Sequence, residues 1–89
     1  MLRLCPNFVI ELLSGSDRLN KAQLKMENWI ANGAELAWLV DPYEKQIQIY
    51  EPGKNPSIET RSSIVGTGPV DGFVLDAVEV WGRYEPEAE

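Results

Sequence analysis

Histidine is absent from this sequence, and cysteine occurs once, at Cys5. Zinc sites are built mainly from cysteine and histidine, so the usual structural and catalytic zinc sites are excluded. A single cysteine also excludes an internal disulfide, and without a histidine Cys5 cannot belong to a cysteine–histidine catalytic pair. We expect Cys5 to be a small buried hydrophobic residue.

Basic residues are few: 8 lysines and arginines stand against 14 acidic residues, for a net charge of −6. Indiscriminate nucleic-acid binding needs a basic surface that releases counterions, so this balance argues against it. A local basic strip formed by Arg18, Lys21 and Lys25 stays open. No apolar run could span a bilayer, and residues 1–8 lack the continuous apolar core of a signal peptide. We therefore expect a cytoplasmic protein with no membrane partner.

The composition is that of one small globular domain. The chain has 89 residues, of which 44% are hydrophobic and 25% charged. A chain of this length buries only about 60 to 65% of its unfolded surface, so its core is small. We assign residues 1–82 to this domain and residues 83–89, with their three glutamates, to an acidic tail.

An apolar run over residues 8–13 contains a single carboxylate, Glu11. The run is too hydrophobic for a half-exposed strand, which predicts a central strand covered on both faces. A carboxylate in such a strand must be hydrogen-bonded, paired with a cation or bound to a metal, because burying it alone is too costly.

A polar turn follows this strand, with Asp17 as a candidate N-cap, and leads into a predicted helix. The apolar residues of that helix fall on one face: Leu19, Ala22, Met26, Trp29, Ile30 and Gly33. This face should pack on the sheet, and Asn32–Gly33 should end the helix in a left-handed cap. Leu24 lies almost opposite, so it is either exposed to solvent or part of a subunit contact.

The remaining chain predicts further strands. Residues 36–40 form a second buried strand that ends at Asp41–Pro42, with Asp41 as a turn-former. Residues 46–51 alternate as a half-exposed strand that pairs back as a hairpin, and residues 57–65 suit a weak edge strand. Residues 73–81 predict a short strand and a helical turn. Together these elements indicate an α/β fold, a mixed sheet with one crossover helix that makes the first two strands parallel.

Glu11 and Lys25 are the only acid–base combination that this packing should bring together. A lysine ammonium beside a carboxylate-bound divalent cation can stabilise a phosphoryl transition state. By themselves, the two residues favour the simpler interpretation, a hydrogen-bonded sheet carboxylate and a solvated lysine. We expect Trp29 and Trp38 to fill the core between helix and sheet.

Three segments resemble the Uma-type restriction endonuclease family, a branch of the PD-(D/E)xK nuclease superfamily: PNFVIELLSGSDRLNKAQLKMENWIANGAELAWLVDP, QIQIYEPG and DGFVLDAVEVW. The resemblance implies a partial restriction-endonuclease-like fold. It also implies an endonuclease activity that cleaves DNA with Mg²⁺ or Mn²⁺ as cofactor. Pro6 matches the family's proline. Asn7 and Glu11 take the positions of its two metal-binding carboxylates. Lys25 corresponds to a helix lysine that replaces the one the superfamily places at Leu13, so the implied catalytic residues are Glu11 and Lys25.

The sequence departs from the family pattern in two ways. Asn7 stands where the family has aspartate, and an amide without the negative charge should bind Mg²⁺ much more weakly. The sequence also begins at this strand, whereas family members are longer, so the resemblance covers a C-terminal half. The leading hypothesis is therefore a truncated, degenerate nuclease homologue with little or no activity alone.

Two alternatives remain open. In the first, the chain is an active endonuclease completed by oligomerisation or by a separate N-terminal half. In the second, it is a non-catalytic interaction module that self-associates, because a missing half would uncover a sheet edge and apolar surface. For the interaction module we expect a homo-oligomer, a dimer or higher, with Leu24 or the first strand buried in the contact.

Overall fold

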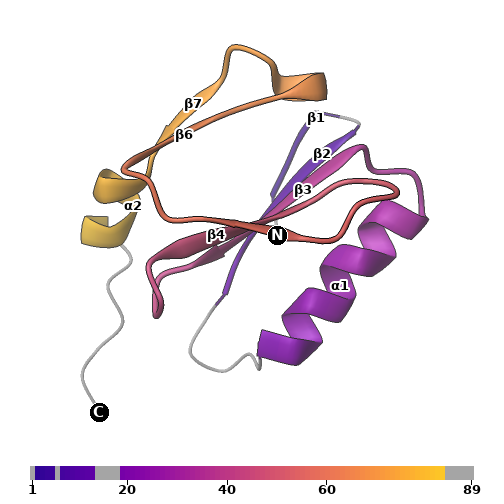
Figure 1. Cartoon of the computed structure of the whole chain (residues 1–89), viewed down its shortest axis with the longest axis horizontal. Coiled ribbons are helices and arrows are strands. Elements are labelled where there is room, and N and C mark those ends of the chain that lie inside the picture. The colour runs from indigo at the N-terminus through magenta and orange to yellow at the C-terminus, as the bar shows by residue number, and fades with distance from the viewer. Residues whose placement is uncertain (1, 6, 14–18, 84–89) are drawn as a thin grey trace.

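The computed structural model describes residues 2–5, 7–13 and 19–83. The apolar runs and the helical stripe produce the elements in the order expected, with β1 added before them and the 3-10 turn η1 added between β6 and β7 (Figure 1). The elements are β1 (Leu2–Cys5), β2 (Phe8–Leu12), α1 (Leu19–Ala31), β3 (Leu36–Asp41), β4 (Gln46–Tyr50), β5 (Ser57–Glu59), β6 (Ser63–Val65), the 3-10 turn η1 (Gly68–Val70), β7 (Val74–Asp76) and α2 (Ala77–Arg83).

The main sheet has five strands in the order β1-β2-β3-β4-β5. β2 and β3 are parallel, and the other neighbouring pairs are antiparallel. This confirms the mixed sheet and the crossover through α1, and it places the strand that carries Glu11 inside the sheet. β1 was not predicted; it forms one edge of the sheet, so β2, the first strand predicted from the sequence, has a neighbouring strand on each side and no free edge. β6 and β7 pair with each other in a second, two-stranded sheet.

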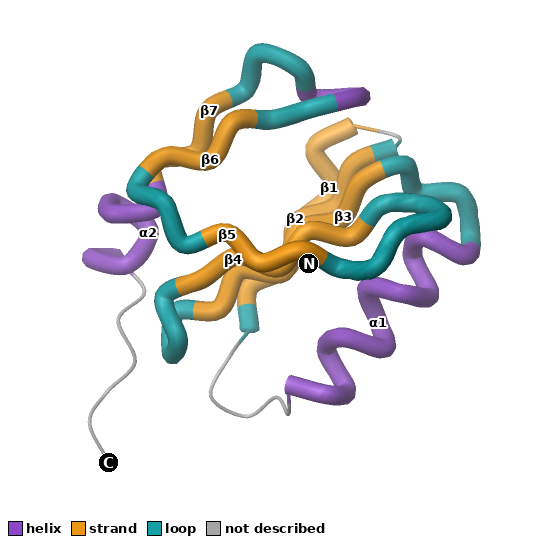
Figure 2. Tube along the Cα trace, in the orientation of Figure 1, coloured by secondary structure: helices purple, strands orange, loops and turns teal. Residues whose placement is uncertain are grey.

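Each face of the main sheet has its own cover (Figures 1 and 2). α1 covers one face, where Ala22 and Met26 pack on Val9, Leu39 and neighbouring residues. The β6–β7 hairpin and α2 lie over the opposite face. The small chain thus divides its core into two layers of side chains, separated by the strands.

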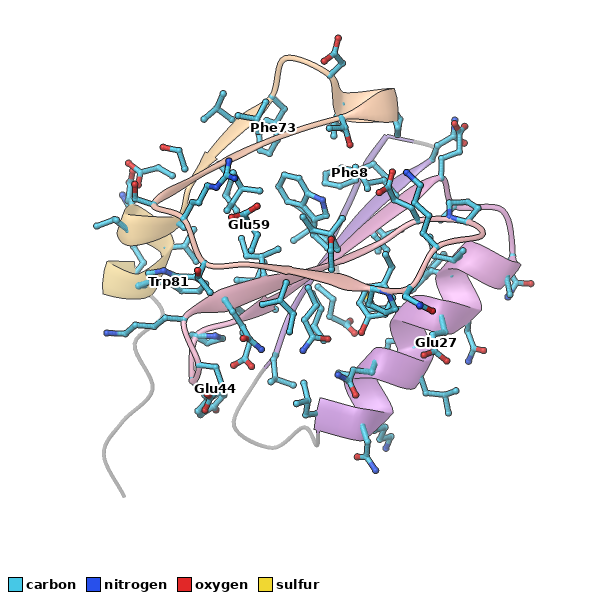
Figure 3. The ribbon with its side chains drawn as sticks, in the orientation of Figure 1. Phe8, Glu27, Glu44, Glu59, Phe73 and Trp81 are labelled. Atoms are coloured by element: carbon cyan, nitrogen blue, oxygen red, sulfur yellow. The ribbon has the colours of Figure 1, made fainter. Side chains whose placement is uncertain are left out.

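Trp38 belongs to the layer opposite α1, so the prediction that it fills the core between helix and sheet is wrong. Side chains alternate along β3, and Trp38 faces away from the side of Leu39. Its ring meets Phe8 edge-on, with centroids 5.2 Å apart, and lies 6.0 Å from Phe73. Figure 3 shows Phe8 and Phe73 on this side of the molecule, away from Glu27 on α1.

The helix buries the central residues of its predicted face and ends where predicted. Ala22 and Met26 are buried, but Leu19 is 39% exposed, because it lies at the first turn of α1, beyond the closest packing on the sheet. Gly33 has φ +106°, and the amide of Ala34 donates to the carbonyl of Trp29 at 3.0 Å, as a left-handed C-cap requires. Leu24 is 57% exposed. Asp17, the candidate N-cap, and Cys5's side chain lie outside the described residues.

Two strand predictions need correction. β4 pairs with β3 as predicted, but it is not half-exposed, because α1 covers Gln48 and Tyr50 on the face predicted to be open. Residues 57–65 are not one edge strand: β5 joins the main sheet, and after a bend at residues 61–62 the chain enters β6 of the second sheet.

Two further predictions are confirmed. Asp41 forms the expected turn, since its Oδ1 accepts the amides of Tyr43 at 2.9 Å and Glu44 at 3.1 Å. Residues 73–81 contain β7 and most of α2. None of the helices in the described part of the chain is long and apolar enough to cross a membrane. The tail from residue 84 lies outside the described residues, so the division at residue 82 stays a prediction.

Candidate functional site

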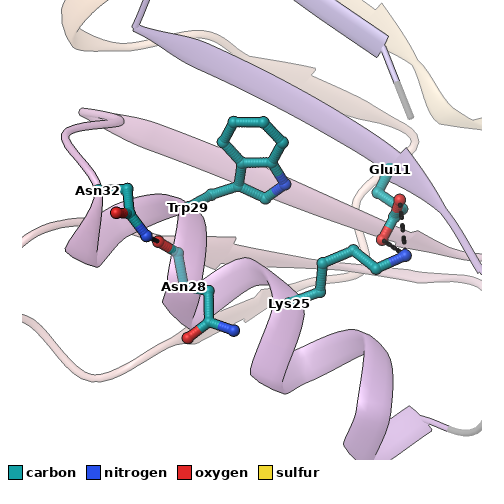
Figure 4. A pocket seen from close by; sticks show the side chains of 5 residues that line it. All are labelled: Glu11, Lys25, Asn28, Trp29 and Asn32. Atoms are coloured by element: carbon teal, nitrogen blue, oxygen red, sulfur yellow. Dashed lines mark hydrogen bonds and ion pairs between the residues drawn. The ribbon is translucent and has the colours of Figure 1, made fainter.

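Glu11 and Lys25 form an ion pair between β2 and α1. Val9, Glu11 and Leu13 alternate onto the face that α1 covers, so Glu11 points toward the helix. Lys25 reaches it from the flank of α1: its Nζ lies 3.2 Å from Oε2 and 3.4 Å from Oε1 (Figure 4). The Glu11 side chain is 8% exposed and that of Lys25 is 50% exposed. A buried carboxylate is therefore compensated by a cation that stays open to solvent.

One oxygen of this carboxylate has coordination capacity to spare. Within the described residues, the buried Oε2 of Glu11 accepts no hydrogen bond. Its contact with the Lys25 ammonium is close enough for an ion pair but lacks the direction of a hydrogen bond. Buried polar atoms are nearly always satisfied, so this oxygen marks a position where another group would be favoured.

A pocket of about 380 Å³ opens beside the ion pair. Glu11 lines it from the sheet, and Lys25, Asn28, Trp29 and Asn32 line it from α1. These helical positions follow the three- and four-residue spacing of one ridge, so their side chains share a flank of the helix. The sequence analysis did not identify Asn28 and Asn32 as site residues, although their spacing from Lys25 places them on its ridge.

The described residues do not form a complete site for a divalent metal. Mg²⁺ requires near-octahedral oxygen coordination, and no group of three or more Asp, Glu, His or Cys residues in the described chain could hold an ion. Glu11 Oε2 could supply one ligand. Asn7 precedes Glu11 by four residues, roughly 13 Å along an extended strand, and does not line the pocket. Its carbonyl accepts the amides of Glu35 and Leu36 at 2.9 and 3.1 Å. Metal binding by Asn7 stays a prediction.

A second polar cluster lies on the opposite flank of α1. The Oε1 of Gln48 accepts hydrogen bonds from Gln23 Nε2 at 3.0 Å and from the Tyr50 hydroxyl at 2.8 Å. Burial raises the pKa of Tyr50 to about 12, and the carboxylate of Glu27 adds to the rise. The bond from Gln23 connects α1 to β4, while the Glu11–Lys25 pair connects it to β2. The helix is thus held to the sheet from both flanks.

The predicted basic strip is only partly visible. Lys21 is exposed on α1, and it does not line the pocket of Lys25. Arg18 lies outside the described residues. Among the three residues of the strip, the structure therefore brings only Lys25 to the candidate site.

Comparisons with known proteins concern almost the whole chain. The family model Uma2, described as "Putative restriction endonuclease", matches residues 1–77. The chain belongs to the Uma2 family. This confirms the resemblance drawn from the sequence, and no curated protein matches the chain significantly.

The fold of this Uma2 chain is also found in a crystal structure. A putative nuclease belonging to DUF820 from Anabaena variabilis superposes with a TM-score of 0.74 at 20% sequence identity. The match covers 86% of the present chain and 44% of the other, so the chain spans less than half the length of that nuclease. At this identity the likeness establishes a shared nuclease-like fold, which confirms the predicted fold class.

Proposed function

We propose that this Uma2 chain carries the lysine and one carboxylate of a metal-dependent DNA phosphodiesterase site, and that by itself it cleaves DNA weakly or not at all. The observation that supports this is the Glu11–Lys25 pair beside an open pocket. Weak activity follows from the donor set: Glu11 is the pocket's one carboxylate among the described residues, and Asn7 carries no charge. The cytoplasmic location of the protein stays a prediction.

In this proposal each residue has a distinct task. The Lys25 ammonium is half exposed, so it can approach the negative charge that grows on phosphoryl oxygens in the transition state. Glu11 lines the same pocket and could hold a divalent metal through one carboxylate oxygen, and a bound metal would supply an activated water. The pair also keeps each charge compensated before substrate binds.

Incubation of the protein with supercoiled plasmid and Mg²⁺ or Mn²⁺ tests the proposal. We expect nicking no faster than that of Glu11→Ala, which removes the carboxylate and serves as the matched control. Robust cleavage that disappears in Glu11→Ala would show that the chain is active alone, and the proposal of weak activity would then be wrong.

A second candidate is an active endonuclease whose site is completed by another copy or by a separately encoded chain. The observation that favours it is the 44% coverage of the related nuclease, which leaves room for further site residues. Asn7→Asp should then raise metal affinity and cleavage. Calorimetry that detects no Mg²⁺ or Mn²⁺ binding even to Asn7→Asp would remove this candidate.

A third candidate is a non-catalytic module that self-associates. β1 is an edge strand of the main sheet, and Leu24 is 57% exposed on α1. An open strand edge favours contact with a second copy, and Leu24 is an exposed apolar residue that such a copy could cover. We propose a homodimer that buries one of these two features.

A further inference from the structure

The candidate pocket contains more than the ion pair. Trp29 and two amides, Asn28 and Asn32, follow Lys25 along the same ridge of α1 and line the same space. Its volume of about 380 Å³ lies within the range of about 300 to 1,000 Å³ that small-molecule sites occupy. The phosphodiesterase proposal uses only Glu11 and Lys25, so the remaining wall has no role in it.

Trp29 occupies the middle of this wall. Figure 4 shows its indole broadside, between Asn32 and the Glu11–Lys25 pair. The ring is partly buried against the core layer under α1, which holds it in place. Asn32 Nδ2 donates to the carbonyl of Asn28 at 2.7 Å, and this bond ties one amide to the helix. The wall therefore presents a supported flat ring flanked by hydrogen-bonding groups.

We propose that this wall is a nucleobase subsite, in which the indole of Trp29 stacks on an unpaired base and the amides of Asn28 and Asn32 bind its edge. Base–indole stacking does not depend on sequence, because every base has a π-face. Amides both donate and accept hydrogen bonds, as the exposed edges of unpaired bases require. The inference rests on the proposed function, which puts a phosphate near Lys25.

The subsite implies a preference for single-stranded DNA or for frayed and overhanging ends. A base inside a duplex is stacked on both sides and must be extruded before it can meet an indole. An unpaired base avoids that cost. The proposal therefore specifies the substrate class of the Glu11–Lys25 site: a nucleotide whose base is already out of the stack.

Binding can be measured without cleavage. Fluorescence anisotropy of a labelled thymidine oligonucleotide, in EDTA and at low salt, should show tighter binding than to an abasic strand of equal length or to a blunt duplex. Trp29→Leu should weaken binding to the thymidine strand at least about fivefold, as expected for the loss of stacking on one base. Binding to the abasic strand should not change, because that strand has no base to stack.

Further variants separate stacking from a loss of folding. Trp29→Phe keeps an aromatic ring and should retain most of the affinity, and Asn28→Ala should weaken binding while Asn20→Ala, an exposed asparagine of α1 outside the pocket, should not. Equal affinity for the thymidine and abasic strands, or an unchanged affinity in Trp29→Leu, would overturn the subsite.

The assay also separates this inference from the proposed function. Weak cleavage that depends on Glu11 and shows no base preference would overturn the subsite and leave the proposed function standing. Base-dependent binding together with robust cleavage that disappears in Glu11→Ala would keep the subsite and contradict the proposal of weak activity. A Trp29 indole NMR signal that shifts with protein concentration, and not with oligonucleotide, would show that a second copy occupies the pocket and would overturn the subsite.

Discussion

At the scale of single residues, two polar groups beneath α1 are buried by tertiary contacts and stabilised by specific partners. Glu11 is compensated by Lys25, and Tyr50 donates its hydroxyl to Gln48. Both lie on the helix-covered face of the main sheet. Each therefore yields a prediction about stability that does not require the function to be known.

Lys25→Met should lower the free energy of unfolding by about 1 to 2 kcal/mol. The expected loss lies between the small contribution of an exposed ion pair to stability and the larger cost of leaving a fully buried charge unpaired. The reason is that Lys25 is half exposed while Glu11 is buried. Urea denaturation measures it, with Lys21→Met, an exposed lysine of the same helix, as the matched control. Equal losses in both variants would mean that the ion pair contributes nothing.

Stability should also fall at alkaline pH because of Tyr50. Its pKa is raised from 10.0 to about 12 in the folded protein, so the folded state holds the proton more tightly than the unfolded state does. The contribution is complete below pH 10 and is lost as the pH rises toward about 12. Tyr50→Phe should remove this part of the pH dependence. Denaturation midpoints measured from pH 10 to about 12 would contradict this prediction if they fell equally in the wild-type protein and in Tyr50→Phe.

At the scale of elements, the second sheet depends on one close backbone approach. The amide of Gly66, which follows β6, donates to the carbonyl of Phe73, which precedes β7, at 2.6 Å. A Cβ added to Gly66 would run into the backbone carbonyl oxygen of Val70 and come within 2.9 Å of the Cγ2 atom of Val70. The turn through η1 therefore folds tightly over a position that only glycine can fill.

Gly66→Ala should destabilise the protein by about 1 to 3 kcal/mol, the usual cost of overpacking. Gly82→Ala is the matched control, because a Cβ there meets nothing within 4 Å and alanine is favoured in helices. It should leave the stability unchanged or raise it by less than about 1 kcal/mol. Thermal unfolding followed by circular dichroism measures both. A tolerated Gly66→Ala would show that η1 can move away from β6.

At the scale of the whole molecule, the two-layer core leaves apolar residues on the surface. Leu24 on α1 and the β1 edge are the features that we expect a second copy to cover. Light scattering should therefore give about twice the chain mass of 10.0 kDa. Leu24→Glu should weaken a dimer that buries Leu24 and leave one formed through the β1 edge intact, whereas Val65→Thr, an exposed position on β6, should weaken neither. A monomer at high concentration would contradict the prediction, and a loss only in Val65→Thr would place the contact elsewhere.

Local pattern was sufficient for the central architecture. The apolar runs of β2 and β3, the stripe of α1 and Gly33 at its end specify the parallel pair and its crossover, because alternation and helical spacing are properties of neighbouring residues. The same pattern also predicted that Glu11 needs a partner and made Lys25 a candidate. The sequence by itself thus determined the mixed α/β sheet with its crossover helix, and the family resemblance added the nuclease-like fold.

Only the tertiary structure decided which polar residues are buried and which apolar ones share a layer. Gln48 alternates like a surface residue, yet α1 covers it and Gln23 and Tyr50 satisfy it. Trp38 lies opposite α1, where the hairpin of β6 and β7 folds back over the sheet. The pocket wall of Trp29 appears only when α1 docks on β2. These outcomes depend on contacts between residues distant in the chain, which no local period encodes.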